Sequence, residues 1–231
     1  IALARKQDSQ VDNAEEERYL IAPSVDWQAT DRTLINFNLY YQNDPSMGIN
    51  SAMPLEVLKA SDPSVSMGDK NWNLLEREVL MVGYKVNHEF NDNWTFLQNA
   101  RYTDASLNQK NTYHLSYDPS TPNQLNRTLY STNESFKGFV IDNLLSGTID
   151  VGSLEHNLLL GVDYQNMDGD VNYSSYTANG GGFNSFDPLN PNNDLLNLSD
   201  VKKKSESLDD TTSSQLGFYL QDQVRLDALV L

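Results

Sequence analysis

The stretch "TLINFNLYYQ", residues 33–42, decides the fold class. Apolar and polar side chains alternate along it, so that Ile35 and Phe37 fall on one side of an extended chain while Asn36 and Asn38 fall on the other. Alternation with a period of two residues predicts a β-strand with one apolar and one polar face. The apolar face could be covered by a second sheet, as in a soluble sandwich, or by lipid, as in a membrane β-barrel.

The same alternation recurs along the chain. It is clear in "RYLIAPSVDWQ" (18–28), "VLMVGYKVNHEF" (79–90), "EHNLLLGVDYQ" (155–165) and "SQLGFYLQDQVRL" (214–226). The stretches "WTFLQNARYT" and "GFVIDNLLSGTI" alternate less cleanly, because Gln98 and Asn143 fall on the apolar side. The dominant element is therefore the β-strand.

The predicted connections alternate in length. Short turns are expected at 29–32, 91–93, 151–154 and 226–228, and long polar loops at 45–75, 106–127 and 172–211, with a shorter one at 7–18. An up-and-down meander with its long loops on one edge is typical of outer-membrane barrels, whereas sandwiches mix their connections through Greek keys. The pattern predicts an all-β chain forming part of an antiparallel, up-and-down transmembrane β-barrel.

Aromatic side chains support this prediction. Trp27, Phe90 and Trp94 lie beside short turns, and the tyrosines near the long-loop ends of strands are Tyr19, Tyr41, Tyr102 and Tyr164. Two aromatic bands are expected where a barrel meets the two layers of lipid headgroups.

Composition excludes several classes of protein. The chain has 231 residues, a formal net charge of -16, no cysteine and 39% hydrophobic residues. No run is apolar for the roughly 20 residues that a transmembrane helix needs. The acidic balance argues against a nucleic-acid partner, whose phosphates it would repel. Absence of cysteine removes disulfides, thiol catalysis and thiolate metal sites.

Catalytic and metal-binding motifs are also not expected. His88, His114 and His156 lack the short spacing of metal ligands, and Asp168 and Asp170 do not follow the ligand pattern of an EF-hand. No nucleophile elbow is found either. We therefore predict neither an enzyme nor a metal site.

Several stretches carry a resemblance to a known family. They are "RYLIAPSVDWQATDRTLINFNLYYQNDPS" (18–46), "VGYKVNHEFNDNWTFLQNARY" (82–102), "HNLLLGVDYQ" (156–165) and "GFYLQDQVRLDALVL" (217–231), with the "FNDNWT" turn and the "YLQDQ" strand the most specific pieces. In these stretches the chain resembles the barrel portion of TonB-dependent siderophore receptors, most of all the ferrichrome-type (hydroxamate) branch.

The resemblance implies a 22-strand barrel plugged by an N-terminal globular domain. Residues 1–231 would all belong to the barrel domain and supply about eight of its strands. We expect the chain to be an interior piece of a longer protein, with the plug, the segment that TonB grips and the closing strand lying elsewhere.

Function follows from the resemblance as a further set of expectations. The protein would be a monomeric receptor in the bacterial outer membrane that binds a ferric siderophore at its extracellular side and imports it with energy supplied by TonB, through the N-terminal region. The ferric siderophore would be transported cargo, and no cofactor is expected. Outer-membrane lipid and lipopolysaccharide would be its other partners.

Aromatic rings suit a bulky, weakly charged chelate whose iron is already wrapped. The candidates for ligand binding are the aromatic residues of the predicted long loops: Trp72, Tyr113, Tyr117, Tyr173, Tyr176, Phe183 and Phe186. The alternative is that these rings pack the loops against one another. Lys202, Lys203 and Lys204, the strong basic run, could reach a lipopolysaccharide phosphate, or could simply face water.

Two other functions remain open from the sequence. One is a passive outer-membrane pore or small barrel, since eight strands can close a barrel. The other is a secreted β-rich protein that binds carbohydrate, which would need its apolar faces packed on each other.

Overall fold

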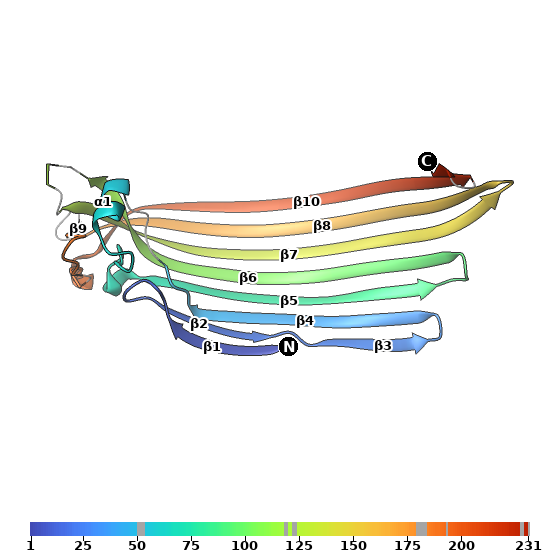
Figure 1. The fold of residues 1–231 in the computed structure, drawn as a ribbon, viewed down its shortest axis with the longest axis horizontal. Coiled ribbons are helices and arrows are strands. Elements are labelled where there is room, and N and C mark those ends of the chain that lie inside the picture. Colours follow the sequence, from blue (N-terminus) through green and yellow to red (C-terminus); the bar gives the residue numbers. More distant parts are fainter. Residues whose placement is uncertain are drawn as a thin grey trace.

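The computed structural model describes residues 1–49, 54–117, 120–121, 124–178, 184–192, 194–226 and 229–230. These residues form one long antiparallel sheet with small additions at one end (Figure 1). Its strands are β1 (Ala2–Asp8), β2 (Glu15–Ile21), β3 (Ser24–Thr30), β4 (Thr33–Ser46), β5 (Leu74–Glu89), β6 (Trp94–Tyr117), β7 (Leu125–Val151), β8 (Leu154–Thr177), β9 (Asn184–Phe186), β10 (Lys202–Leu226) and β11 (Leu229–Val230). The helical pieces are α1 (Leu55–Ala60), η1 (Lys70–Trp72) and η3 (Leu198–Asp200).

The strands follow one another in the sheet as an up-and-down meander. Their order is β1-β2-β4-β5-β6-β7-β8-β10-β11, with β3 paired to β4 and β9 paired to β7. Because β2 and β3 pair with successive parts of β4, they act as one strand interrupted near Pro23. With β2 and β3 counted as one strand, the described sheet has eight main strands, in line with the predicted number of about eight. They are β1, the combined β2–β3 strand, β4, β5, β6, β7, β8 and β10.

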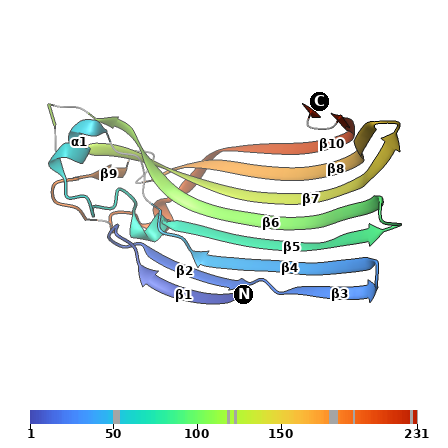
Figure 2. The same cartoon turned by 45° about the vertical axis from the view of Figure 1, so that its right-hand side comes forward.

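The two ends of the sheet differ as the sequence predicted. Tight turns join β3 to β4, β5 to β6 and β7 to β8 at one end, and α1 and β9 lie at the other (Figure 1). Gly152 occupies the turn between β7 and β8 with φ of 65°, a conformation that glycine adopts without steric cost. The predicted turn at 226–228 reaches into residues outside the described part of the chain. Figure 2 shows the strands following a curved path between the two ends.

Between the tight turns and the loop end, nothing in the described chain covers the apolar face of the long strands. The register places Phe37, Tyr84, Ala100, Ile141, Tyr164 and Leu216 in one row across the sheet. Apolar side chains of this face are exposed, Phe218 by 76%. The buried hydrophobic side chains of the described residues lie instead at the loop end, Ala100 excepted. A soluble sandwich would bury this face, so its exposure favours contact with lipid.

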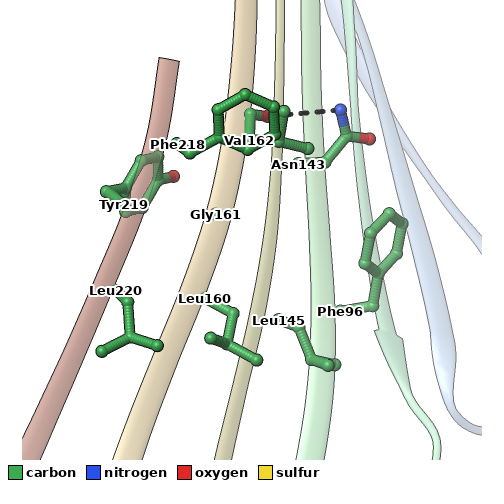
Figure 3. Close-up of a pocket in the computed structure, with 9 residues that line it drawn as sticks. All are labelled: Phe96, Asn143, Leu145, Leu160, Gly161, Val162, Phe218, Tyr219 and Leu220. Carbon is green, nitrogen blue, oxygen red and sulfur yellow. Dashed lines mark hydrogen bonds between the residues drawn. The ribbon is translucent and has the colours of Figure 1, made fainter.

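A shallow depression of about 540 Å³ lies on this apolar face. Figure 3 shows Phe96, Leu145, Leu160 and Leu220 at one height on neighbouring strands, and the register places them in a single row. Its lining is almost wholly hydrocarbon, and it lies within the exposed apolar band. Lipid acyl chains are therefore the natural filling of this depression.

Gln98 and Asn143, which lie on the apolar face, satisfy each other's hydrogen bonds. Tyr84 Oη donates to Gln98 Oε1 (2.8 Å), and Gln98 Nε2 donates to Asn143 Oδ1 (2.6 Å). Asn143 Nδ2 reaches the carbonyl oxygen of Val162 at 3.5 Å, the contact drawn in Figure 3. Unsatisfied polar groups are costly in lipid, so this chain of hydrogen bonds makes Gln98 and Asn143 tolerable there.

The opposite face is polar along the same strands. A depression of about 360 Å³ is lined there by Asn36, Asn38, Lys85, Arg101 and Asp142, among others. Further along, the ring of Tyr219 crosses over Gly161 so that its hydroxyl donates to Asp142 Oδ1 (2.8 Å). The polar face therefore has the character of a water-filled lumen wall.

The strands are longer than the sequence predicted. The predicted loop at 106–127 is mostly strand, because β6 continues to Tyr117 and β7 begins at Leu125. The predicted loop at 172–211 is shortened in the same way by β8 and β10. Crossing a membrane needs only about 9–11 residues per tilted strand, so these strands extend well beyond it. Polar side chains on both faces of the extensions hide the period of two, although backbone pairing continues.

The described part of the chain has no helix of the length and apolar character needed to cross a membrane.

Gly161 offers a test of the packing on the polar face. A Cβ at this position would overlap the ring of Tyr219. We expect Gly161→Ala in the full-length protein to lower stability by about 1–3 kcal/mol, the usual cost of overpacking. Resistance of the folded protein to heating in detergent, followed on gels, measures the effect.

The matched control is the double variant Gly161→Ala with Tyr219→Ser. Removing the ring makes room for the new methyl group, so the double variant should be more stable than the sum of the two single changes predicts. Strict additivity would contradict the proposed overlap.

Candidate ligand-binding site

The loop end of the sheet has a compact core of its own. Residues 54–73, 184–192 and 194–201, which we call the loop cap, lie against the extended parts of β6, β7 and β8. They cover Leu125, Arg127 and Leu129 of β7, which alternate on the same face of that strand as Phe139 and Ile141. We call the part of the strands between the tight turns and Tyr41, Tyr102 and Tyr164 the membrane band. Within this band the apolar face is exposed, and between the band and the loop end the loop cap covers the same face.

A buried ion pair joins the parts of the loop cap. Arg127 is 1% exposed, and its Nη2 lies 3.6 Å from Asp69 Oδ2 while its Nη1 donates to the Met67 carbonyl oxygen at 2.7 Å. Asp69 also accepts hydrogen bonds from the backbone N–H groups of Asn71 and Leu196. The guanidinium lies over the ring of Phe186, 4.5 Å from its centroid. This arrangement connects four separate segments of the chain.

Burial lowers the pKa of Arg127 to about 10, while the charge of Asp69 opposes the shift. Arg127 lies outside the membrane band and remains protonated at neutral pH. The buried pair is therefore ionic under physiological conditions, and removing either partner would leave an uncompensated buried charge.

Three of the predicted ligand-binding rings contribute to the loop cap. Trp72 is 8% exposed; its Nε1 donates to the Tyr130 carbonyl oxygen (2.9 Å), and its ring meets that of Tyr176 edge-on with centroids 4.9 Å apart. Phe186 is 2% exposed and lies beside Arg127, in one buried hydrophobic cluster with Val57, Val65, Met67 and Leu125. These positions support the alternative in which the rings pack the loops.

The opposite, polar face of the same strand extensions carries a cluster of three tyrosines. Tyr113 of β6, Tyr130 of β7 and Tyr173 of β8 lie side by side, with ring centroids 5.5 Å apart between Tyr113 and Tyr130 and 6.0 Å apart between Tyr130 and Tyr173. Gln109 Nε2 donates to Tyr130 Oη at 2.7 Å. Tyr113 is 37% exposed, so the cluster presents aromatic surface to a ligand.

The phenols of Tyr130 and Tyr173 stay neutral at physiological pH. Burial raises the pKa of Tyr130, and burial together with the hydrogen bond to Tyr113 raises the pKa of Tyr173 to about 12. Neutral phenols donate hydrogen bonds and are poor ligands for a metal ion. The cluster therefore suits a chelate whose iron is already coordinated.

A pocket of about 340 Å³ lies next to the tyrosine cluster on the same face. Leu107, Phe136 and Val171 supply its apolar surface, and Arg77 and Glu134 supply its charges. Thr132 pairs with Tyr173, and Glu134 follows two residues later on β7, which is about 7 Å along a strand. Tyrosine cluster and pocket together form a continuous inner-wall site, and this is our candidate ligand-binding site.

A buried carboxylate orients Arg77 beside this pocket. Asp44 is fully buried; it accepts hydrogen bonds from Arg77 (2.7 and 3.1 Å), from Arg18 Nε (2.6 Å) and from Gln42 (2.6 Å). Burial alone would raise the pKa of Asp44, but these hydrogen bonds lower it below the usual range. Asp44 follows Tyr41 toward the loop end and lies outside the membrane band. At neutral pH it is therefore ionised and offsets part of the positive charge of Arg77 and Arg18.

The remaining predicted site residues are placed as follows. Phe183 and the side chain of Tyr117 lie outside the described residues. Lys202, Lys203 and Lys204 are exposed at the start of β10, and Lys203 Nζ lies 2.9 Å from Glu206. Of the predicted rings, Tyr113 and Tyr173 are the two brought together on the inner wall. Whether any of them contacts a ligand stays a prediction.

Tyr130 was missed by the sequence reasoning. It falls just after the predicted loop at 106–127, in a polar stretch where alternation gives no clear face. Its partners are two residues on neighbouring strands, which the sequence alone does not bring together. No cluster of three or more potential metal-ligating side chains occurs among the residues that the structure describes.

Asp44→Asn tests the clamp beside the pocket. The loss of a buried charge facing two arginines, both partly exposed, should cost about 1–2 kcal/mol of stability in the full-length protein. Because the pKa of Asp44 is lowered on folding, its contribution is present above about pH 4, the unfolded value, and is lost as the pH falls further. Melting temperature measured against pH would show this.

The wild-type protein and Asp44→Asn should therefore differ at pH 7 and converge in acid. Arg5→Ala is a suitable control, since it removes an exposed ion pair with Glu16 at the same end of the sheet. A difference between wild type and Asp44→Asn that does not change with pH would contradict the ionic role of Asp44.

Comparison with known proteins connects this sheet to receptors. Residues 18–231 match the family model described as "TonB dependent receptor-like, beta-barrel". The ferrioxamine B receptor of Salmonella typhimurium (strain SL1344) is 30% identical over 231 residues, covering 97% of this chain and 32% of the relative. The ferrichrome outer membrane transporter/phage receptor of Escherichia coli (strain K12) is 30% identical over 253 residues, covering 99% and 34%. The chain thus spans about a third of the length of these relatives.

Solved structures show the same fold. The siderophore receptor PiuA from Acinetobacter baumannii aligns with a TM-score of 0.76 at 17% identity, covering 97% of this chain and 35% of that one. The closed form of the ferric-catecholate import receptor Fiu from Escherichia coli K12 aligns with a TM-score of 0.78 at 16% identity, covering 98% and 34%.

The matched structures confirm the predicted fold class. The family and the curated relatives, which are receptors and transporters, confirm the outer-membrane location and the prediction that the chain is not from an enzyme. The long strands with one exposed apolar face are the transmembrane part of such a barrel. The chain belongs to the TonB dependent receptor-like β-barrel family.

Proposed function

We propose that the protein containing this chain is an outer-membrane receptor for a ferric siderophore of the hydroxamate type, which it imports with energy supplied by TonB. The observation that carries the proposal is the inner-wall site, where three tyrosines border a partly apolar pocket. Two relatives are named for ferrioxamine B and ferrichrome, and this supports the choice of ligand class.

The chemistry of the site fits such a cargo. A ferric hydroxamate is compact, and its iron is enclosed, so it needs shape, aromatic surface and hydrogen-bond donors in place of metal ligands. Tyr113, Tyr130 and Tyr173 offer rings and hydroxyl groups on three neighbouring strands. Ligand passage would break no covalent bond in this account, and the receptor would act as a monomer.

The loop cap gives the site a defined wall. The buried Arg127–Asp69 pair and the cluster around Trp72 support the outer face of β6, β7 and β8, so that their inner face can be presented to the ligand without large rearrangement. A preorganised wall reduces the entropy lost on binding. Trp72, Tyr176 and Phe186 are in this account supporting residues, and Tyr113 and Tyr173 remain the proposed ligand contacts.

Uptake measurements test the function. The full-length receptor, expressed in an iron-starved strain that lacks its own receptors, should import radioactive iron bound to a trihydroxamate when TonB is present and fail to do so without it. Passage that is indifferent to TonB would contradict the proposal and favour a passive pore.

Tyrosine variants test the site. Tyr113→Ala and Tyr173→Ala should each weaken chelate binding about tenfold, the effect expected for loss of one aromatic contact. Tyr102→Ala removes a ring from the opposite, apolar face and should leave binding unchanged. Equal effects of the three substitutions would rule out a specific role for the inner wall.

We also propose that the basic run at the start of β10 contacts lipopolysaccharide phosphate. Lys202, Lys203 and Lys204 are exposed where the strand extends from the membrane band, and a phosphate could displace the Glu206 carboxylate from Lys203. Neutralising all three to glutamine should lower the amount of lipopolysaccharide that copurifies with the receptor. Unchanged retention would refute this contact.

A further inference from the structure

Glu134 is a charged residue of the inner-wall site without a countercharge of its own. It lies on β7 between Leu107 of β6 and Val171 of β8, and all three line the pocket of about 340 Å³. Its side chain is partly buried. In the described part of the chain, no ion pair within 4.0 Å involves Glu134.

The other charge in the pocket, that of Arg77, is partly compensated by Asp44. Arg77 donates two hydrogen bonds to Asp44, whose second oxygen is held by Arg18. Asp44 is fully buried, so this pairing is protected from water. Asp44 is thus shared by two arginines, and these three groups together keep one positive charge. Glu134 and Asp209, which lie in the same row across the sheet, outweigh that charge and make the row acidic.

No second cation of the described inner wall lies near Glu134. Arg101 pairs with Val140, which follows Glu134 by six residues on β7, a separation of about 20 Å along a strand. This exceeds the Debye length of about 8 Å at physiological ionic strength. Asp209 of β10 pairs with Val171 of β8, which places a second carboxylate in the same row of residues across the sheet.

We infer that the inner-wall site selects ferric chelates that carry a free ammonium group, with Glu134 as the counter-ion of that group. The inference rests on the proposed siderophore function and names the charge class of its substrate. A half-buried carboxylate interacts with a cation more strongly than a fully solvated one. The neighbouring tyrosine rings, together with Phe136, would further favour an alkylammonium through cation–π contact.

The same charge would act against other ligands. An anionic chelate would place like charge beside a carboxylate that is not neutralised, which disfavours binding. A neutral chelate would gain nothing from Glu134 and would leave it partly desolvated. The pocket should therefore rank otherwise identical chelates in the order cationic, neutral, anionic.

Three probes of one skeleton isolate this effect. They are a linear ferric trihydroxamate with a free terminal amine, the same chelate N-acetylated, and the same chelate N-succinylated. Equilibrium binding to the purified full-length receptor would be followed by quenching of protein fluorescence. We expect the amine to bind about tenfold more tightly than the acetylated form, corresponding to one charge-assisted hydrogen bond at a partly exposed site. The preference should decrease as salt is added.

Glu134→Gln keeps the size of the side chain and removes its charge. It should reduce the tenfold preference to near unity, mainly by weakening the binding of the amine-bearing chelate. Glu78→Gln is the matched control, because Glu78 is an exposed carboxylate on the opposite face of β5, the strand beyond β6 in the sheet. This variant should retain the wild-type preference.

The outcomes distinguish a failure of the ammonium site from a failure of the proposed siderophore function. If the wild-type receptor binds all three chelates equally, or if Glu134→Gln discriminates as the wild type does, the ammonium site is wrong and the siderophore function stands. If the wild-type receptor binds none of the three, the hydroxamate function itself is overturned, and the inference with it.

Discussion

Backbone hydrogen bonding in lipid is the constraint on which the rest of the structure depends. No water is available there to satisfy an N–H or C=O group, so every crossing strand must be paired along its length. The antiparallel ladder from β4 to β10 meets this demand and in doing so fixes the register. A slip of one residue would turn every side chain of a strand to the other face. The division into an apolar and a polar face is therefore a property of the whole sheet.

The same ladder explains where a ligand can bind. Because β6, β7 and β8 continue far beyond the membrane band, their two faces acquire different neighbours above it. The outer face is covered by the loop cap, with the Arg127–Asp69 pair at its centre, and the inner face is left with the tyrosine cluster and the pocket beside Glu134. Burying a charged pair is not a strong source of stability, but it does specify one arrangement of the loops. The defined packing of the loops on the outer face thus supports ligand recognition on the inner face.

The fold could be predicted from the sequence wherever lipid imposes a period of two. Residues 33–42 show both faces clearly, and the turns near Asp31 and Asn91 follow from the ends of the alternating stretches. Gln98 and Asn143 looked like exceptions, and the structure explains them, because residues on three strands complete one another's hydrogen bonds. Beyond the membrane band the prediction fails, since polar side chains on both faces of β6 and β7 resemble a loop.

The candidate site was predictable only in part. Loop aromatic residues were sensible candidates by residue type, yet type does not distinguish Trp72, which packs beneath the loops, from Tyr173, which lies on the inner wall. That distinction depends on pairings between residues about 20 to 60 positions apart, such as those of Tyr130 with Asn111 and of Trp72 with the Tyr130 carbonyl group. Glu134 escaped notice for the same reason, because its lack of a partner is visible only when its neighbours are known.

The central claim is that one face of the sheet meets lipid and the other meets an aqueous lumen. These 231 residues contain no cysteine, so a cysteine introduced here has no native counterpart in this part of the receptor. Single cysteines would be placed at each position from 33 to 42 in the full-length receptor in membranes, coupled to a fluorophore, and exposed to brominated lipid or to a water-soluble quencher. The account predicts strict alternation, with lipid quenching at Ile35, Phe37 and Leu39 and aqueous quenching at Asn36, Asn38 and Tyr40. Equal quenching of both sets by the aqueous reagent would contradict it.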